Sequence, residues 1–456
     1  MFAKVLIANR GEIAVRIIRA CRELGIQTVA IYSEADRYAL HTELADEAVC
    51  IGPARATDSY LNQQQILSAA ILTGAEAIHP GFGFLSENSR FATMCEECRL
   101  TFIGPSAETI ELMGNKINAR TEMKKAGVPV IPGSEGLLET SDEALEVAQA
   151  IGFPIMLKAA AGGGGKGIRK VMDASELASQ FKAAQQEALA AFDNGQMYLE
   201  KIIYPARHIE VQILGDKSGN IIHLGERDCS LQRQNQKVLE EAPAPNLPQP
   251  LREELGQAAV KAAQAVCYEN AGTIEFLVDE ANEFYFMEMN TRIQVEHPVT
   301  EMVTQIDLVK EQLRLAYGHE LRVTQAQVSF QGHAIECRIN AEDPSFNFSP
   351  VPGTLDHVYL PAGGMGIRVD SAVYNGYYIP PYYDSMIAKI IVHGKTRLEA
   401  LAKMQRALAE LVVEGVATNH EFQQDLISNT NVIAGTYDTS FLQETFLPDW
   451  QQEDNE

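Results

Sequence analysis

The sequence lacks the features that would assign it to a membrane-spanning or a disulfide-bonded class. No apolar run approaches the length of a membrane span, and the first residues, MFAKVLIANRG, resemble a strand rather than a signal peptide. The seven cysteines are odd in number and scattered. Cys95 and Cys98 form a lone CxxC without the second pair of ligands that zinc needs, so we expect ordinary thiols there. A cytoplasmic location is the expectation.

Positive charge is also scarce, because 37 lysines and arginines stand against 61 acidic residues and leave a net charge of −24. Nucleic acid and anionic membranes select basic surfaces, so neither is expected as a partner. An anionic substrate would need a locally basic pocket. Neither an internal repeat nor a low-complexity block occurs, and a chain of 456 residues with 46% hydrophobic content suits a soluble protein of about two to four domains.

Residues 1–113 alternate predicted strands with predicted helices. Strands over 4–8 and 27–33 flank a helix over 13–24, which is how a doubly wound α/β domain begins. The turn NRGE (9–12) has one glycine where a dinucleotide-binding turn needs three. We therefore expect an α/β domain without a dinucleotide cofactor.

The pattern changes near residue 114. A helix and the Gly-Val-Pro hinge at 127–129 occupy 114–130, and a smaller α+β unit is expected over 131–203. In this unit a strand that carries Lys158 precedes the glycine run AGGGGKG, and a strand over 168–172 follows it.

The glycine run fits neither of two common phosphate motifs. Gly162, Gly164 and Gly167 match GxGxxG, but the run lies between two strands rather than between a strand and a helix. Lys166 is followed by glycine, which excludes a Walker A loop. A strand-glycine-strand hairpin is typical of a flexible flap whose backbone N–H groups cover phosphates, and a plain flexible loop is the alternative. The neighbouring lysines favour phosphate.

From residue 204 the chain is expected to return to sheet. Strands over 208–214 and 221–224 precede a polar segment, GERDCSLQRQNQK, and a helix over 250–268 leads to a hairpin. The remaining expected segments are a catalytic region over 204–329, a mixed C-terminal domain over 330–446 and an acidic tail over 447–456.

The hairpin carries the clearest candidate for a metal site. Glu288 and Asn290 are two residues apart on its second strand and so share a face, and a symmetric hairpin about the turn 279–282 places Glu275 opposite Glu288. Two carboxylates and a carboxamide form an oxygen-only set that suits Mg²⁺ or Mn²⁺. A solvated hairpin end is the alternative.

Three features of the sequence together suit ATP-dependent activation of an oxyanion. They are a flap with lysines, a metal site of oxygen ligands, and a basic cluster beside a carboxylate. The chain also resembles a known family, biotin carboxylase, the ATP-grasp component of biotin-dependent carboxylases. The similarity covers nearly the whole chain, through KVLIANRGEIAVRIIRA, HPGFGFLSEN, KAAAGGGGKG, GERDCSLQ, EEAPAP, EMNTRIQVEHPVTE and ECRINAEDP. It implies an ATP-grasp fold with an N-terminal Rossmann-like domain, a mobile glycine-rich lid and a mixed C-terminal domain.

The resemblance implies ATP and two Mg²⁺ or Mn²⁺ ions, with Glu275, Glu288 and Asn290 on the metals. The residues implied at the nucleotide are Lys116, Lys158, Gly162, Gly163, Gly164, Gly165, Lys166, Gly167, Glu200, Lys201, His208, Gln232, Asn235, Glu275, Leu277 and Glu288.

The resemblance also implies a bicarbonate and biotin end. Glu296 would take the bicarbonate proton, and the oxygen would attack the γ-phosphate of ATP. The carboxyphosphate would split into CO₂ and phosphate, phosphate would take the N1′ proton of biotin, and Arg338 would stabilise the enolate. For Glu296 and Arg338 alone an ordinary salt bridge is the alternative. The implied residues are Phe82, Lys237, Arg292, Gln294, the backbone of Val295, Glu296 and Arg338.

Two positions depart from the common family pattern. Phe82 stands where the family usually has Tyr, and Gln234-Asn235 stands where it often has Arg-His. Asn still donates and accepts hydrogen bonds, so activity is expected to be kept. Asn at this place also occurs in urea-type carboxylases. Acetyl-CoA, and with it fatty acid synthesis, is the first expectation for the final acceptor, and pyruvate, another acyl-CoA and urea are alternatives.

The expected partners follow from motifs that the sequence lacks. It contains neither an Ala-Met-Lys-Met-type biotinylation site nor a carboxyltransferase region, so we expect a separate biotin carboxyl carrier protein and a carboxyltransferase subunit. The family suggests a homodimer. The rival hypotheses are another ATP-grasp ligase and a non-catalytic nucleotide-binding subunit. Release of ADP that needs both bicarbonate and biotin would separate them from a biotin carboxylase.

Overall fold

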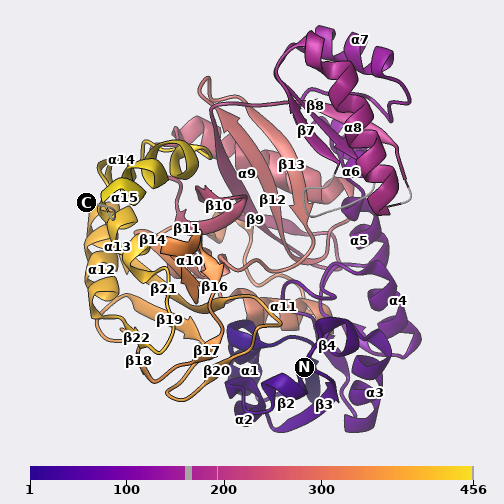
Figure 1. Cartoon of the computed structure of the whole chain (residues 1–456). Helices are drawn as coiled ribbons and strands as arrows, with labels where there is room; N and C mark the ends of the chain where they lie inside the picture. Colours follow the sequence, from indigo (N-terminus) through magenta and orange to yellow (C-terminus); the bar gives the residue numbers. More distant parts are fainter. Residues whose placement is uncertain (160–166, 193, 454–456) are drawn as a thin grey trace. The chain divides into compact units, whose positions relative to one another are not determined.

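The computed structural model describes residues 1–159, 167–192 and 194–453. The chain divides into two compact units (Figure 1). None of the helices in this described part is both long and apolar enough to cross a membrane. Unit 1 comprises Met1–Glu111, Arg207–Ile274 and Met289–Glu456, and unit 2 comprises Leu112–Ala206 and Glu275–Glu288.

Unit 1 begins with a parallel sheet of five strands in the order β3-β2-β1-β4-β5. Val5 and Ile7 of β1 pack with helix α1, whereas Leu6 packs with α3 and α4 on the other face. A strand buried on both faces is continuously apolar, as this one is. The doubly wound α/β prediction is therefore confirmed. The bounds are β1 Lys4–Ile7, α1 Gly11–Glu23, β2 Gln27–Ser33, β3 Glu47–Gly52, α3 Gln63–Thr73, β4 Ala77–His79, α4 Ser89–Glu97 and β5 Thr101–Phe102.

A second, mainly antiparallel sheet crosses the rest of unit 1 in the order β12-β9-β10-β11-β14-β21-β19. Its strands are β9 Ala206–Gly215, β10 Ile221–Arg233, β11 Gln236–Ala242, β12 Asn270–Asp279, β14 His333–Asn340, β19 Ile367–Ser371 and β21 Met386–Gly394. Helix α9 (Gln249–Ala265) leads into β12.

The predicted end of strand β10 was wrong. The sequence suggested a strand over 221–224 followed by a polar segment, but β10 runs to Arg233 and most of its polar residues are buried. Its pairing with β9 shifts register between His223 and Glu226, and its pairing with β11 shifts again after Asp228. Bulges of this kind break the two-residue period by which a strand is recognised in a sequence.

The β14–β21 pair separates an apolar core from a charged layer. Ile335, Cys337 and Ile339 of β14 pack with helix α12 (Arg397–Glu410) in the core. On the opposite face, Ala334 and Ile391 pack against helix α10 (His297–Thr304), and Glu336 and Arg338 alternate with the core residues along β14. The same strands thus build a hydrophobic core on one side and present charge on the other.

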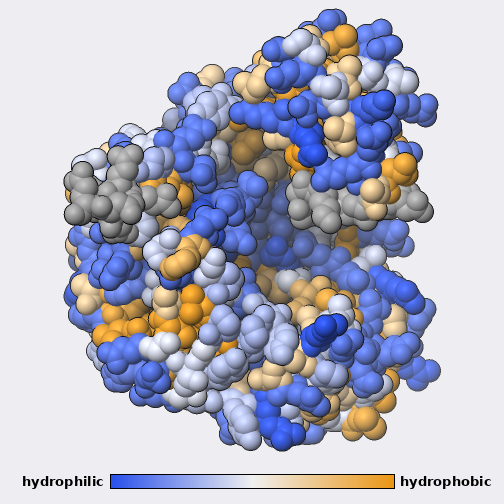
Figure 2. Space-filling model, viewed as in Figure 1, coloured by the Kyte–Doolittle hydropathy of each residue, from blue (hydrophilic) through white to orange (hydrophobic). Residues whose placement is uncertain are grey.

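This core reaches the molecular surface at short edge strands. Half-buried Val358, Ile367 and Val413 come from β18 (His357–Tyr359), β19 and β22 (Val412–Glu414). Figure 2 shows hydrophobic side chains gathered over this part of unit 1.

Unit 2 has its own sheet and core. Strand β6 (Ile155–Ala159) lies between β7 (Ile168–Val171) and β8 (Met197–Lys201), and both pairs are antiparallel. Helices α7 (Ser141–Ile151) and α8 (Ala174–Phe192) pack on the sheet through a shared apolar cluster. In the same unit, strand β13 (Phe284–Asn290) meets the segment after helix α6 (Lys116–Lys125), where Phe286 N donates to Pro129 O at 2.7 Å.

The predicted flap lies only partly within the described residues, because 160–166 fall outside them. Gly167, which directly precedes β7, has φ +71, and a Cβ there would stand 2.8 Å from the Cβ of Ala159. This end of the flap therefore requires glycine both for its backbone conformation and for space.

Candidate active site

Glu296 lies at the centre of the charged layer in unit 1, immediately before helix α10. It is 2% exposed, and its carboxylate accepts hydrogen bonds from Lys237 Nζ at 2.6 Å and from Arg338 Nη2 at 3.1 Å. Burial opposes its ionisation, but Lys237, Arg338 and Arg227 outweigh burial and hold the pKa of Glu296 well below its ordinary value. The structure thus brings three predicted residues of the bicarbonate end together, with the carboxylate ionised between two cations.

Lys237 bridges two buried carboxylates. Its ammonium also donates to Glu210 Oε2 at 2.6 Å. Lys237 lies on β11 and Glu210 on β9, with β10 between these two strands. Oxygens of Glu210 and Glu296 and the thiol of Cys229 lie within 4.8 Å of one another, but the lysine already supplies the positive charge between the carboxylates. Glu210 was not predicted from the sequence, although a glutamate inside the buried run HIEVQIL was the available signal.

Arg227 supports this cluster from β10. Its guanidinium is fully buried and pairs with Glu210, so it holds one partner of Lys237 in place. It also donates to Gln294 Oε1 at 3.0 Å, which orients a residue predicted at bicarbonate. Arg227 was not predicted, because its segment resembles a polar loop in the sequence. Further Arg227 donations go to Gln212 at 2.7 Å, Thr300 at 3.0 Å and Thr273 at 3.1 Å.

Arg292 is oriented by the loop HPGFGFLSEN. Its Nε donates to Glu87 Oε2 at 3.1 Å, and Glu87 also accepts from the backbone N–H of Thr291 at 3.0 Å. Its Nη2 donates to Asn290 Oδ1 at 3.2 Å. Glu87 was not predicted, because 205 residues separate it from Arg292 along the chain.

Phe82, in the same loop, is held in a tight turn. Its carbonyl oxygen accepts a hydrogen bond from Asn9 Nδ2 at 2.7 Å, and its ring packs on the core beside α1. Gly81 and Gly83 on either side have φ +62 and +67. The loop is thus a tight turn with an aromatic side chain packed on the core.

Arg338 contacts a second carboxylate besides Glu296. Its Nε donates to Glu240 Oε1 at 2.6 Å, and Glu240 is paired in register with Glu336 on the neighbouring strand. Both glutamates are fully buried. Burial, with Glu296 adding to it and Arg338 opposing it, raises the pKa of Glu240 to about 7.

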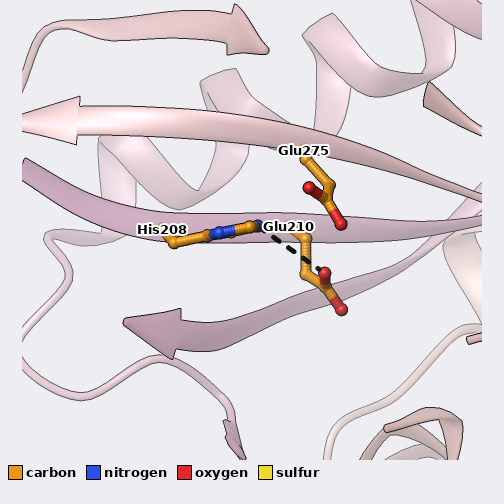
Figure 3. Close-up of side chains that lie close together, drawn as sticks. All are labelled: His208, Glu210 and Glu275. Carbon is orange, nitrogen blue, oxygen red and sulfur yellow. Dashed lines mark ion pairs between the residues drawn. The ribbon is translucent and has the colours of Figure 1, made fainter. Parts of the chain in front are cut away.

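The residues predicted at the nucleotide occupy both units. In unit 1, His208 Nδ1 lies 2.8 Å from Gln232 Nε2, and His208 Nε2 lies 3.9 Å from Glu210 Oε2 (Figure 3). Asn235 forms with Gln234 the two-residue turn between β10 and β11, and both have positive φ. Such a turn favours Asn, which gives this departure from the family pattern a backbone role.

In unit 2, lysines and carboxylates face one another. Lys116 Nζ lies 3.1 Å from Glu288 Oε2, and Lys158 donates to Glu200. Lys201 instead donates to Ile151 O at 3.1 Å, at the end of α7. Leu277 is half-buried on β12.

The donor chemistry of unit 2 fits a divalent cation. The pKa of Lys116 is raised, first by Glu288 and further by Glu200 and Glu275, so three carboxylates concentrate negative potential around one ammonium. Glu275 is buried and Glu288 is half-buried. Oxygen ligands of this kind suit Mg²⁺ or Mn²⁺.

Three family models match the chain one after another. They are the biotin carboxylase N-terminal domain over residues 1–110, the ATP-binding domain of the carbamoyl-phosphate synthase L chain over 115–324, and the biotin carboxylase C-terminal domain over 336–444.

Curated relatives and solved structures agree with these models. Biotin carboxylase 1 of Bacillus subtilis is 60% identical over 97% of this chain and 98% of its own length, and a pyruvate carboxylase subunit of Methanothermobacter thermautotrophicus is 53% identical over 97% and 90%. The biotin carboxylase of Campylobacter jejuni in a βγ-ATP complex superposes with a TM-score of 0.93 at 48% identity, covering 97% of this chain and 98% of that one. A dimer of the biotin carboxylase domain of Hydrogenobacter thermophilus 2-oxoglutarate carboxylase, bound to MgADP and bicarbonate, gives 0.92 at 52% identity with the same coverage.

Proposed function

The chain belongs to the biotin carboxylase family, and from this premise we propose that it carboxylates biotin on a separate carrier protein with ATP and bicarbonate. It is an ATP-grasp enzyme, an ADP-forming ligase. The observation that carries the proposal is the ionised Glu296 carboxylate between Lys237 and Arg338, at 2.6 and 3.1 Å. A buried base between two cations is suited to receive an anion that carries a proton.

Glu296 is proposed as the general base. Its depressed pKa keeps it ionised but makes it a weak proton acceptor while both cations contact it. A bicarbonate anion that enters beside Lys237 and Arg338 offsets part of the positive charge that stabilises the Glu296 carboxylate. The pKa of Glu296 therefore rises as the substrate binds. The base therefore becomes effective when the proton to be removed is present.

Bicarbonate is proposed to lie against Arg292, Gln294 and the backbone N–H of Val295. The guanidinium of Arg292 offers a planar fork for the anion, and Glu87 fixes its direction. Gln294 is oriented through Arg227. After the proton leaves, the bicarbonate oxygen attacks the γ-phosphorus of ATP, and ADP departs from the carboxyphosphate.

Residues of unit 2 are proposed to bind the phosphates of the nucleotide, with 131–203 as the lid. Glu275, Glu288 and Asn290 would bind two Mg²⁺ or Mn²⁺ ions, which neutralise phosphate charge when bound. Lys116 and Lys158 are proposed at the phosphates, in line with their present pairing with Glu288 and Glu200. The other proposed nucleotide contacts are Gly162, Gly163, Gly164, Gly165, Lys166, Gly167, Glu200, Lys201, His208, Gln232, Asn235 and Leu277.

Biotin is proposed to enter beside Phe82 and Arg338. Carboxyphosphate splits into CO₂ and phosphate, phosphate takes the N1′ proton, and Arg338 stabilises the ureido enolate that captures CO₂. The carboxybiotin then passes to a carboxyltransferase subunit, for which we propose acetyl-CoA as the acceptor. The relatives named for pyruvate and 2-oxoglutarate supply the other acceptors to be tested, and a homodimer is the proposed assembly.

Steady-state release of ADP tests the proposal. Wild-type protein with Mg-ATP should release ADP only when bicarbonate is present, and free biotin should stimulate the release. Glu296→Gln removes the base but keeps the shape, so kcat should fall by about 10²- to 10⁴-fold.

Glu311→Gln is the matched control. Glu311 is also a buried glutamate paired with an arginine, Arg314, but it lies on helix α11 (Leu308–Tyr317) away from the charged layer. Its turnover should stay within about twofold of wild type, because its partner Arg314 is not among the proposed site residues. Wild-type release that ignores biotin would overturn the proposed function.

A further inference from the structure

Lys389 is a fully buried lysine on β21 that the mechanism above does not use. Its Nζ lies 3.1 Å from Glu12 Oε1 and 4.0 Å from Asp370 Oδ2, and the side chain is 0% exposed. Burial opposes its charge, but Glu12, Glu336 and Asp370 outweigh burial and raise the pKa of Lys389 above its ordinary value. It is therefore a buried ammonium.

The ammonium donates a hydrogen bond to the main chain of the site. Lys389 Nζ lies 2.7 Å from the carbonyl oxygen of Val295. That carbonyl belongs to the peptide unit that joins Val295 to Glu296. The bond therefore acts on the backbone that presents both the Val295 N–H and the Glu296 side chain.

The position of Lys389 on its strand adds a second, independent observation. Lys389 is paired in register with Arg338 on β14, so the two side chains stand next to each other on the charged face of the sheet. Arg338 contacts the carboxylate of Glu296, and Lys389 contacts the peptide that precedes it. Arg338 thus holds the side chain of Glu296, and the neighbouring Lys389 holds the peptide that precedes Glu296.

Glu12 connects this arrangement to the N-terminal sheet. It lies in the first turn of helix α1, is buried, and pairs with Lys389 at 3.1 Å. A buried charge is tolerated when a counter-charge is held close to it. Glu12 therefore keeps the ammonium at Val295 and ties helix α1 to the turn before α10.

We propose that Lys389 is a positioning residue for the bicarbonate step, which fixes the Val295–Glu296 peptide so that the Val295 N–H and the Glu296 carboxylate meet the same anion. The inference rests on the proposed function of this site. It goes beyond it by assigning a role in the reaction to a residue that touches neither bicarbonate nor nucleotide. Nucleotide binding should not depend on Lys389, because its hydrogen bond to Val295 O acts on the bicarbonate side alone.

The test compares the kinetics of Lys389→Met for its two substrates, bicarbonate and ATP. Methionine fills the volume of the lysine stem but cannot donate to Val295 O. We expect kcat/KM for bicarbonate to fall by about a hundredfold, since a misplaced reacting group costs about that much. The KM for ATP and the Kd for MgADP should stay within about twofold of wild type, although the melting temperature falls.

Glu12→Gln is the second variant, in case Lys389→Met does not fold. It keeps the shape of the side chain and a hydrogen-bond acceptor but removes the counter-charge of Lys389. We expect the same selective loss for bicarbonate, about tenfold, with the KM for ATP again unchanged. Equal losses for both substrates in these variants would overturn the inference, because they would show a general loss of structure.

Arg368→Met is the matched control. Arg368 lies in the same charged layer and pairs with Glu301 and Asp370 at 2.6 Å each, but it donates nothing to the Val295 peptide. It should lower the melting temperature as Lys389→Met does while leaving the ratio of the two KM values unchanged. The same bicarbonate-selective loss in Arg368→Met would overturn the inference. Failure of the proposed function is a different result, since wild type itself would then lack biotin-stimulated turnover.

Discussion

At the scale of single residues, Glu240 and Glu241 show how a strand gives neighbouring carboxyls opposite chemistry. Glu240 lies on the charged face beside Arg338, and burial raises its pKa to about 7. Glu241 points the other way and is also buried, but hydrogen bonds from His333 and Arg397 outweigh burial and lower its pKa to about 2. The Arg397 bonds are 2.7 and 2.9 Å, and the His333 bond is 2.6 Å.

These opposite shifts predict opposite pH dependences of stability. Glu240 binds its proton more tightly in the folded protein, so its contribution is complete below about pH 4.5 and is lost as the pH rises through about 7. Glu241 binds its proton less tightly, so its contribution is complete above about pH 4.5 and is lost as the pH falls through about 2. Each shift corresponds to a free energy of unfolding on the order of 3 kcal/mol.

Urea unfolding of Glu240→Gln and Glu241→Gln against pH checks this. Relative to wild type, Glu240→Gln should gain stability as the pH rises from about 5 to 7. Glu241→Gln should be less stable than wild type at neutral pH, and its deficit should shrink as the pH falls below about 4.5. Parallel curves for the two variants would contradict the assigned environments.

At the scale of elements, regular patterns in the sequence were sufficient to predict helices and strands where local packing decides the structure. The strand predicted over 27–33 coincides with β2, and the helix predicted over 13–24 corresponds to α1, which runs over Gly11–Glu23. Both are buried on faces that their periodicity marks. The bulged strand β10 could not be predicted in this way, because its register shifts and buried polar residues remove the alternation.

The predicted site residues could be named from motifs, but the side chains that orient them could not. Glu87 holds Arg292 from 205 residues away, and Lys389 holds Val295 from 94 residues away. Nothing local in the sequence marks such a pair, since the fold alone brings the two partners together. For Lys389, its place inside the apolar strand MIAKIIVHG was a visible sign, because a buried lysine is rare unless it is paired.

The β6–β7 hairpin of unit 2 gives a prediction at this scale. Gly167→Ala places a side chain in a left-handed conformation, which costs about 1–2 kcal/mol, and adds a close approach to Ala159. We expect a lower unfolding temperature for unit 2 and a several-fold higher KM for ATP, because the proposed flap ends at this residue. Thermal unfolding and initial rates measure the two effects.

Gly219→Ala provides the comparison for Gly167→Ala. Gly219 also has positive φ, +85, but a Cβ there meets no atom within 4 Å, and the residue lies in the turn between β9 and β10 of unit 1. It should show the backbone cost alone and an unchanged KM for ATP. An unchanged KM in Gly167→Ala as well would count against a flap at this place.

At the scale of the whole molecule, the chain contains two units with separate cores. Unit 2 has an apolar cluster of its own around Leu157, Leu177 and Phe181. Unit 1 buries larger clusters, one of them around the β14–β21 pair. Domains that each bury a core can open independently, and lids of active sites come from the less stable parts of a protein.

Separate cores predict two unfolding transitions in calorimetry of the full chain. Leu157→Ala in unit 2 and Ile390→Ala in unit 1 form a matched pair, because both side chains are fully buried in their cores. Each substitution removes a buried side chain and should destabilise its own unit by about 2–5 kcal/mol. Leu157→Ala should shift one transition and Ile390→Ala the other, and the shift should be larger per kcal/mol in the smaller unit 2.

Mg-ATP distinguishes which transition belongs to the proposed lid. A ligand stabilises the unit that binds it by an amount that grows with its concentration above Kd. If residues of unit 2 hold the nucleotide, saturating Mg-ATP should raise the transition that Leu157→Ala lowers. A single transition that both variants shift equally would show instead that the two cores unfold as one cooperative structure.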